Sequence, residues 1–401
     1  MVQPVGTRPD VEAGASNMNH SDALALVDLA PVARLLMLAL ALAALPMAWL
    51  WLRQRGSDTP TRLAALTALT LFLTFDLIVF GAFTRLSDSG LGCPDWPGCY
   101  GQATPLGARA DIHAAQSAAP GGPVTWSKAW IEMIHRYLAM TVGVLILVMA
   151  VVSWLVKKRL PFSPWLPTFT LLWVMVQGLF GKYTVTLKLY PAVVTLHLLG
   201  GLFLLALLAL QHVAFRPQPV ELPPKLRWLL GMALLVVAVQ VTLGGWVSTN
   251  YAVLACTGFP QCNSQWWPEM DWSGAFTVLR GLGETGPNGA KTLTTLVTIH
   301  MAHRIGALVA STALLALAWG LWSHRRTEPA AGPFALVIFI LLLAQVASGL
   351  SNVVLGWPLL AALGHSAGAA ALVLVLAQLW ARARLSAKSF AAPVSERGWP
   401  A

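Results

Sequence analysis

Four histidines recur at a fixed spacing, and each lies inside a long apolar run. His135 and His303 are separated by 168 residues, and His197 and His365 are separated by the same interval. An ionisable side chain is costly inside an apolar helix of membrane length, so it indicates a functional site by default. A single such histidine could be neutral and bonded to a backbone carbonyl. Four at repeat-related positions instead predict two equivalent sites of two histidines each.

A pair of imidazoles on neighbouring helices suits the iron of a haem, which takes axial ligands on its two faces. We therefore predict one haem in each site. Zinc is a weaker interpretation, because it needs about four ligands and Glu132 is the only further candidate. A di-iron carboxylate site needs the Glu-x-x-His motif twice, whereas the second copy carries His300 in place of Glu132. No other metal site is predicted.

The exchange of Glu132 for His300 makes the two sites chemically different. Glu132 lies three residues before its histidine, on the same helix face. A carboxylate beside a haem can transfer protons or stabilise a cation that forms at the haem edge. The first copy is therefore predicted to be the reactive site and the second to be a cofactor site. The alternative is a structural carboxylate paired with Arg136 or Lys128.

An arginine follows the first histidine of each copy, at Arg136 and Arg304. A buried arginine needs an anionic partner. Haem propionates would supply one, through paired hydrogen bonds. The alternative is that both side chains extend to the lipid headgroups.

Long apolar helices must position these residues. The chain has 401 residues, of which 57% are hydrophobic and 10% charged, whereas a soluble domain has about 25% charged residues. This composition predicts a polytopic membrane protein, and the runs are too long and too uniformly apolar for barrel strands. The net charge of +10 is assigned to loops and not to nucleic-acid binding. Nine spans are predicted, at residues 31–52, 63–84, 129–155, 164–187, 192–214, 227–248, 293–322, 333–355 and 358–381.

The loops give the expected orientation. Lysine and arginine gather in every second loop, which places those loops on the cytoplasmic side. The N-terminus is then outside, the C-terminus inside, and the two long loops at 85–128 and 249–292 face outward. Residues 1–30 are predicted to be a disordered tail, 31–52 an accessory transmembrane helix and 382–401 a cytoplasmic tail.

Residues 63–214 and 227–381 are predicted to be two copies of one four-helix unit. Gln177 and Gln345 share the 168-residue offset of the histidines, while Gly81 and Gly244 share an offset of 163 with the cysteines. An even number of helices separates the copies, so both have the same orientation, related by a pseudo-two-fold axis along the membrane normal. The predicted fold is an all-α integral membrane protein of two tandem four-helix bundles, each with a site in its core.

The four cysteines form two Cys-x5-Cys pairs in the outward loops. An oxidising compartment favours the disulfides Cys93–Cys99 and Cys256–Cys262. We interpret the second pair as a structural link. The first flanks the predicted reactive site, so a redox or gating role stays open for it. A thiolate metal site is less favoured, because its cysteines would have to stay reduced outside the cell.

The stretch from Gly81 to Gly101, GAFTRLSDSGLGCPDWPGCYG, strongly resembles the first outer loop of bacterial haem A synthases. The motifs at 132–136 and 303–304 are similar to helix motifs of that family, and the resemblance covers residues 63–381. The family oxidises the C8 methyl group of haem O to a formyl group, giving haem A for cytochrome oxidase assembly. Cys93 and Cys99 match the branch with a cysteine pair. The resemblance implies a bacterial inner membrane, with the cysteine loops on the periplasmic face.

The same resemblance implies a role for each site. His303 and His365 would ligate a resident haem b in the 227–381 bundle, and His135 and His197 would hold substrate haem O in the 63–214 bundle. Glu132 would be the catalytic carboxylate. Haem O synthase, a farnesyltransferase, is an expected partner beside the membrane lipid. A homo-oligomer and the identity of the electron acceptor are left open, and helix 31–52 departs from the usual eight spans.

Two other functions would also explain four histidines. One is a di-haem electron-transfer protein of the b type, and the other is a haem carrier without turnover. Neither function gives Glu132 a chemical role, which favours the enzyme.

Overall fold

A computed structural model describes residues 30–279 and 291–391. Regular structure in these ranges is helical, which confirms the all-α prediction, and only isolated bridges such as Cys99–Gln102 pair extended backbone. The helix α11 continues to Ala391, past the predicted end of the last span, while the rest of the two predicted tails lies outside the described residues. The α-helices are α1 (Ala30–Arg53), α2 (Thr59–Leu86), α3 (Arg109–Ala118), α4 (Trp126–Leu155), α5 (Trp165–Thr186), α6 (Pro191–Phe215), α7 (Pro224–Thr249), α8 (Trp272–Ala275), α9 (Leu293–His324), α10 (Ala331–Val354) and α11 (Leu359–Ala391).

Eight helices of the described chain are long and apolar enough to cross a membrane, so the chain is a multi-pass membrane protein. They are α1, α2, α4, α6, α7, α9, α10 and α11. Helix α5 has 22 residues but includes Gln177 and Lys182, which lower its hydropathy. It packs against α4 and α6. The ninth span therefore stays a prediction that depends on α5.

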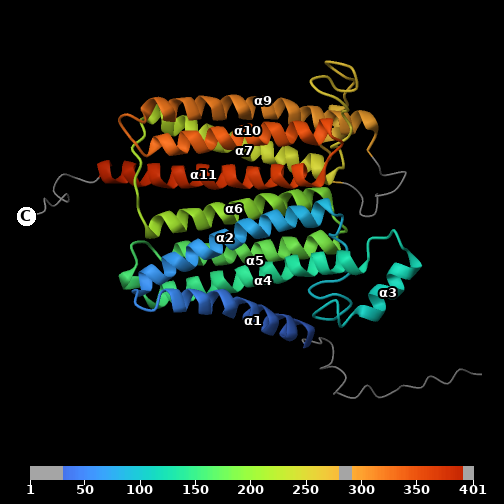
Figure 1. Cartoon of the computed structure of the whole chain (residues 1–401), viewed down its shortest axis with the longest axis horizontal. Coiled ribbons are helices and arrows are strands. Elements are labelled where there is room, and N and C mark those ends of the chain that lie inside the picture. Colours follow the sequence, from blue (N-terminus) through green and yellow to red (C-terminus); the bar gives the residue numbers. More distant parts are fainter. Residues whose placement is uncertain (1–29, 280–290, 392–401) are drawn as a thin grey trace, which may run out of the picture.

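Two groups of four helices lie side by side (Figure 1). In the N-terminal unit, α2 packs on α4, α4 on α5, α5 on α6, and α6 on α2. In the C-terminal unit, α7 packs on α9, α9 on α10, α10 on α11, and α11 on α7. Helix α11 also packs on α2 and α6, and α1 covers α4 from outside the N-terminal unit. The pseudo-two-fold axis remains a prediction.

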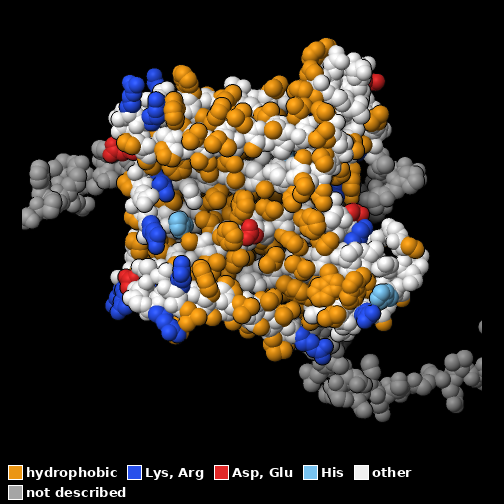
Figure 2. All heavy atoms as spheres, in the orientation of Figure 1, with side chains coloured by type: hydrophobic (Ala, Val, Ile, Leu, Met, Phe, Trp, Pro, Cys, Tyr) orange, Lys and Arg blue, Asp and Glu red, His pale blue; other side chains and the backbone are white. Residues whose placement is uncertain are grey.

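The tightly packed apolar cores lie toward the end with the short basic loops. Leu145, Leu205 and Leu208 are fully buried in the N-terminal unit, and Leu230 and Leu317 are fully buried in the C-terminal unit. Figure 2 shows most Lys and Arg side chains of this view at that end, with a hydrophobic belt beside them. The long loops after α2 and α7 fold over the opposite end, which we call the cysteine-loop end. Each predicted ligand histidine lies in the part of its helix nearest this end.

Two threonine caps set the depth of the first histidine in each unit. Thr125 accepts a hydrogen bond from the backbone of Lys128 at 3.3 Å, and Thr292 accepts one from Thr295 at 3.2 Å. Side-chain caps of this kind fix where a helix begins. His135 and His303 follow their caps by similar numbers of residues, which places both about 15 Å along their helices at the rise of an α-helix.

Candidate haem sites

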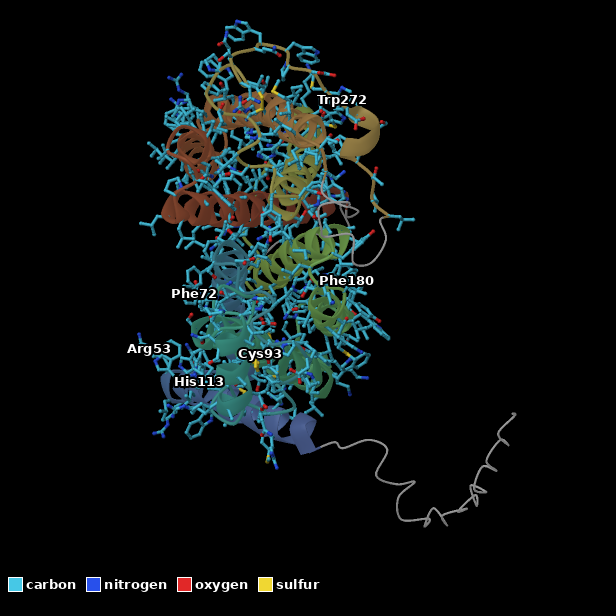
Figure 3. The ribbon with its side chains drawn as sticks, turned by 90° about the vertical axis from the view of Figure 1, so that its right-hand side faces the viewer. Arg53, Phe72, Cys93, His113, Phe180 and Trp272 are labelled. Atoms are coloured by element: carbon cyan, nitrogen blue, oxygen red, sulfur yellow. A yellow bond between two sulfur atoms is a disulfide. The ribbon has the colours of Figure 1, made fainter. Side chains whose placement is uncertain are left out.

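Glu132 is buried beneath the first cysteine loop. The predicted disulfide Cys93–Cys99 is present, and Cys93 Sγ packs 3.9 Å from the carbonyl oxygen of Ala129 in the first turn of α4. Figure 3 looks onto this end and labels Cys93 there. The backbone N–H of Cys93 donates to Glu132 Oε2 at 2.8 Å, and Arg136 Nη2 donates to Oε1 at 2.5 Å. Both carboxylate oxygens thus have partners, and the disulfide loop supplies one of them.

Arg136 fastens the same loop to α4. Its Nη1 donates to the carbonyl oxygens of Asp95, Pro97 and Gly98 at 2.9, 3.2 and 2.5 Å. The ion pair with Glu132 is buried, and removing one partner of such a pair typically costs about 3–5 kcal/mol. The structure therefore contains the Glu132–Arg136 pair that sequence analysis offered as an alternative. A propionate contact for Arg136 stays a prediction.

The C-terminal unit repeats this plan without a carboxylate. The disulfide Cys256–Cys262 is present, as predicted. His300 is buried, and its Nδ1 lies 3.0 Å from a backbone carbonyl oxygen of the second cysteine loop. Arg304 donates to the carbonyl of Gln261 at 3.1 Å, but no anion faces it from position 300. The two units therefore share a scaffold, and the buried carboxylate of the first is replaced by an imidazole in the second.

Each of the four ligand candidates packs against a glycine of the preceding long helix. The missing side chain leaves room for an imidazole between the two helices. A Cβ added to these glycines would lie within 2.9 to 3.6 Å of the nearest ring atom. These glycines follow the same two repeat offsets as the histidines and cysteines. The pairs are His135 with Gly81, His197 with Gly181, His303 with Gly244, and His365 with Gly349.

The structure brings His303 and His365 together. Their ring centroids are 6.5 Å apart, and the ring planes are 78° apart. Two imidazoles that share one metal through bonds of about 2 Å have centroids roughly 6 Å apart. His135 and His197 also lie close enough for their rings to interact electrostatically. The sequence suggested neighbouring helices, but each pair comes from helices that lie across their four-helix unit from one another, α4 with α6 and α9 with α11.

The residues present fit a haem better than a bare metal ion. Among the described residues, no group of three or more His, Cys, Asp or Glu side chains could hold a metal ion. Two imidazoles suffice for haem iron, because the porphyrin brings the other ligands. His197 Nδ1 is buried and makes no hydrogen bond to the protein, which is unusual for a buried imidazole that has only a structural role.

Asp271 anchors the second cysteine loop to the start of α9. Its carboxylate accepts hydrogen bonds from Ser273 Oγ at 2.6 Å, Gly274 N at 3.0 Å and Thr295 Oγ1 at 3.0 Å. These bonds, with that of Ser273 the strongest, lower the pKa of Asp271 to about 2. The carboxylate is therefore ionised at neutral pH and keeps its three donors.

Comparison with known proteins agrees with this geometry. The family model described as a cytochrome oxidase assembly protein, COX15-CtaA, matches residues 64–377. The chain belongs to the COX15-CtaA family. The match begins in α2 and ends in α11, so it spans both helical units and all four ligand candidates.

Several relatives of this COX15-CtaA chain are named heme A synthase. The protein of that name from Shewanella oneidensis is 40% identical over 320 residues, which cover 79% of this chain and 94% of the relative. The one from Shouchella clausii is 28% identical over 301 residues, covering 73% and 86%. The one from Rhizorhabdus wittichii is 28% identical over 349 residues, covering 81% and 94%.

Sequence analysis of this COX15-CtaA member missed two polar neighbours of the histidines, Gln240 and Ser348. Gln240 Nε2 lies 3.0 Å from His303 Nδ1, and Ser348 Oγ lies 3.0 Å from His365 Nδ1. Neither residue has a polar counterpart at the aligned position of the first copy, so the repeat gave no signal for them. The glycines opposite His197 and His365 do follow the 168-residue offset and could have been found in that way.

Proposed function

We propose that this chain converts haem O to haem A by oxidising the C8 methyl group to a formyl group. Membership of the COX15-CtaA family and similarity to proteins named heme A synthase support an oxidoreductase of haem biosynthesis. The observation that carries the proposal is Glu132, a single buried carboxylate at one of two matched histidine pairs. A pure electron carrier would need no such difference between its sites.

We assign substrate haem O to His135 and His197 in the N-terminal unit, and resident haem b to His303 and His365 in the C-terminal unit. Haem b, when bound, supplies one-electron transfer. The contact between α6 and α7, and the packing of α11 on α2 and α6, place the two units side by side. Side-by-side packing supports electron transfer from one site to the other.

Glu132 is the proposed catalytic carboxylate. It lies one turn from His135 and is held by the Cys93 amide and Arg136, so its position is fixed before substrate binds. A fixed carboxylate can accept a proton that is released as the methyl group is oxidised, or stabilise positive charge that develops there. His300 offers no comparable negative charge, which fits a non-reacting cofactor site.

Arg304 is a stronger candidate than Arg136 for a propionate partner. Its Nε is buried without a partner, while its terminal nitrogens donate only to backbone carbonyls. Arg136 already faces the Glu132 carboxylate. We propose that Arg304 binds a propionate of haem b and that Arg136 does so for haem O through its remaining donor capacity.

We further propose that the protein spans the bacterial inner membrane nine times, with the cysteine loops in the periplasm. The basic loops at the opposite end support this orientation. Haem O carries a long apolar side chain and is made by a farnesyltransferase, so we propose haem O synthase as the partner that supplies it.

The proposal is tested by producing the chain in cells that make haem O but lack haem A. Haem extracted from these cells would be identified by mass. Haem A that depends on the chain would support the enzyme. Bound haem B alone, despite abundant haem O, would favour an electron-transfer protein, and bound but unchanged haem O would favour a carrier.

A further inference from the structure

The two histidines of the C-terminal site are held by hydrogen bonds that reach both ring and backbone. Gln240 Nε2 lies 3.0 Å from His303 Nδ1 and 3.1 Å from its carbonyl oxygen. Ser348 Oγ lies 3.0 Å from His365 Nδ1, and Gln345 Nε2 donates to the His365 carbonyl at 2.9 Å. Both Nδ1 atoms thus have a protein partner, which leaves Nε2 of each ring for a ligand.

The N-terminal site lacks these contacts. The position aligned with Gln240 is Leu77, which packs against the apolar core, and the position aligned with Ser348 is Phe180 of α5 (Figure 3). His197 Nδ1 is buried without a partner, and both polar side-chain atoms of Gln177 are also buried without partners. Within the described residues, no hydrogen bond holds the ring of His135.

The orientation of His135 shows the consequence. The other three rings present Cε1 to their glycines, whereas His135 presents Nε2 to Gly81. A half-turn of this ring would bring Cε1 to Gly81, as in the other sites. Because nothing bonds to the ring, both orientations are available to it.

A histidine that binds iron through Nε2 carries its proton on Nδ1, and the group that accepts this proton fixes the ring and its tautomer. The Ser348 hydroxyl can accept it directly. Gln240 can accept it through Oε1, which is buried without a partner, after a half-turn of its amide that gives up the bond to the His303 carbonyl. Loss of such an outer partner typically lowers metal affinity about 10- to 100-fold.

We propose that Gln240 and Ser348 are positioning residues that make the C-terminal site retain its haem. Leu77 and Phe180 leave the ligands of the N-terminal site unrestrained, so its haem exchanges. The inference rests on the proposed function, because a substrate site must release its haem after each turnover and a resident cofactor site need not.

Haem release from the full-length protein tests this inference. The protein is loaded with haem B in detergent, excess apomyoglobin is added as the acceptor, and the Soret band is followed. Release from the C-terminal site is measured with His135 and His197 replaced by alanine. Gln240→Leu and Ser348→Ala should then each release haem about 10- to 100-fold faster than the parent.

Variants that keep an acceptor serve as matched controls for misfolding. Ser348→Thr keeps the hydroxyl and should release haem at the parent rate. Gln240→Glu keeps an acceptor and adds charge, so the haem should be retained and its midpoint potential should fall. Rapid release from both controls, or parent-like release from both Gln240→Leu and Ser348→Ala, would overturn the inference.

The reciprocal exchange gains a property, which misfolding cannot produce. With His303 and His365 replaced by alanine, Leu77→Gln and Phe180→Ser together should slow haem release from the N-terminal site. Unchanged or faster release would contradict the inference. These assays involve no turnover, so failure of the proposed function is separate: it would appear as absent haem A in the preceding test, whatever the release rates.

Discussion

The glycines that face the histidine rings allow a graded test of the haem sites. A Cβ at Gly81 would lie 2.9 Å from His135 Nε2, and one at Gly244 would lie 3.1 Å from His303 Cε1. Both distances are shorter than ordinary contacts, so the ring must move. At Gly181 the distance to His197 is 3.6 Å, which is an ordinary contact. Alanine at Gly181 therefore serves as the matched control.

The expected loss follows from the cost of overpacking. Extra methyl groups in a packed interior typically cost about 1–3 kcal/mol, which is about a 5- to 140-fold loss of affinity. Alanine also favours a helix over glycine by about 1 kcal/mol, so a weaker helix cannot explain lost haem. Gly81→Ala and Gly244→Ala should each lose haem affinity in this range at their own site, and Gly181→Ala should lose none.

Haem titration followed by the Soret band measures these affinities, and thermal melting of the helical circular dichroism controls for the fold. Equal losses for Gly81→Ala and Gly181→Ala would refute the reasoning, because the structure separates them by the space beside the ring. So would unchanged affinity in Gly81→Ala and Gly244→Ala.

Three further predictions concern the loops and the topology. Replacing Cys93 and Cys99 with alanine should free the loop that holds Glu132 and lower the stability of the folded state by about 2 kcal/mol, as expected for a loop this short. Haem A production should fall while the haem of the C-terminal site is retained. Equal loss of both would contradict this local role. Ala119 and Ser163 are both exposed and lie in loops predicted on opposite sides of the membrane. In spheroplasts, an impermeant maleimide should therefore label Ala119→Cys but not Ser163→Cys. The reverse pattern would invert the topology. The hydrogen bonds of Asp271 stabilise the folded loop at pH values above the unfolded pKa of an aspartate, about 3.9. This stabilisation should be lost as the pH falls through the folded pKa of Asp271, about 2. Protection of the Gly274 amide against hydrogen exchange should then fall in the wild type and not in Asp271→Asn.

The sequence was sufficient to predict the all-helical fold, both disulfides and the proximity of His303 to His365. Helices of about 20 apolar residues are determined locally. The repeat assigned His135 and His197 to one copy, and His303 and His365 to the other, before any contact was known. The second cysteine pair was predicted from its spacing and its loop, and the structure contains it.

The partners of these residues could not be predicted, because they depend on helix rotation and loop path. The sequence allowed Arg136 to face a propionate, Glu132 or the lipid headgroups, and the structure turns it to Glu132 and the backbone of the first cysteine loop. Gln240 and Ser348 each reach a ring nitrogen across a different helix interface, and a shift of one position on either helix of an interface would remove its contact. Such contacts follow from packing geometry and not from local pattern.

The measurement that tests the account most directly compares Glu132→Gln with its repeat counterpart His300→Gln. Both variants would be produced with a haem O synthase, and their extracted haem would be identified by mass. Glutamine keeps an acceptor for the Cys93 amide, and haem B retained at the C-terminal site shows that each variant folds. The account predicts haem O in place of haem A for Glu132→Gln, with haem A still made by His300→Gln. Haem A from Glu132→Gln at the wild-type level would contradict it.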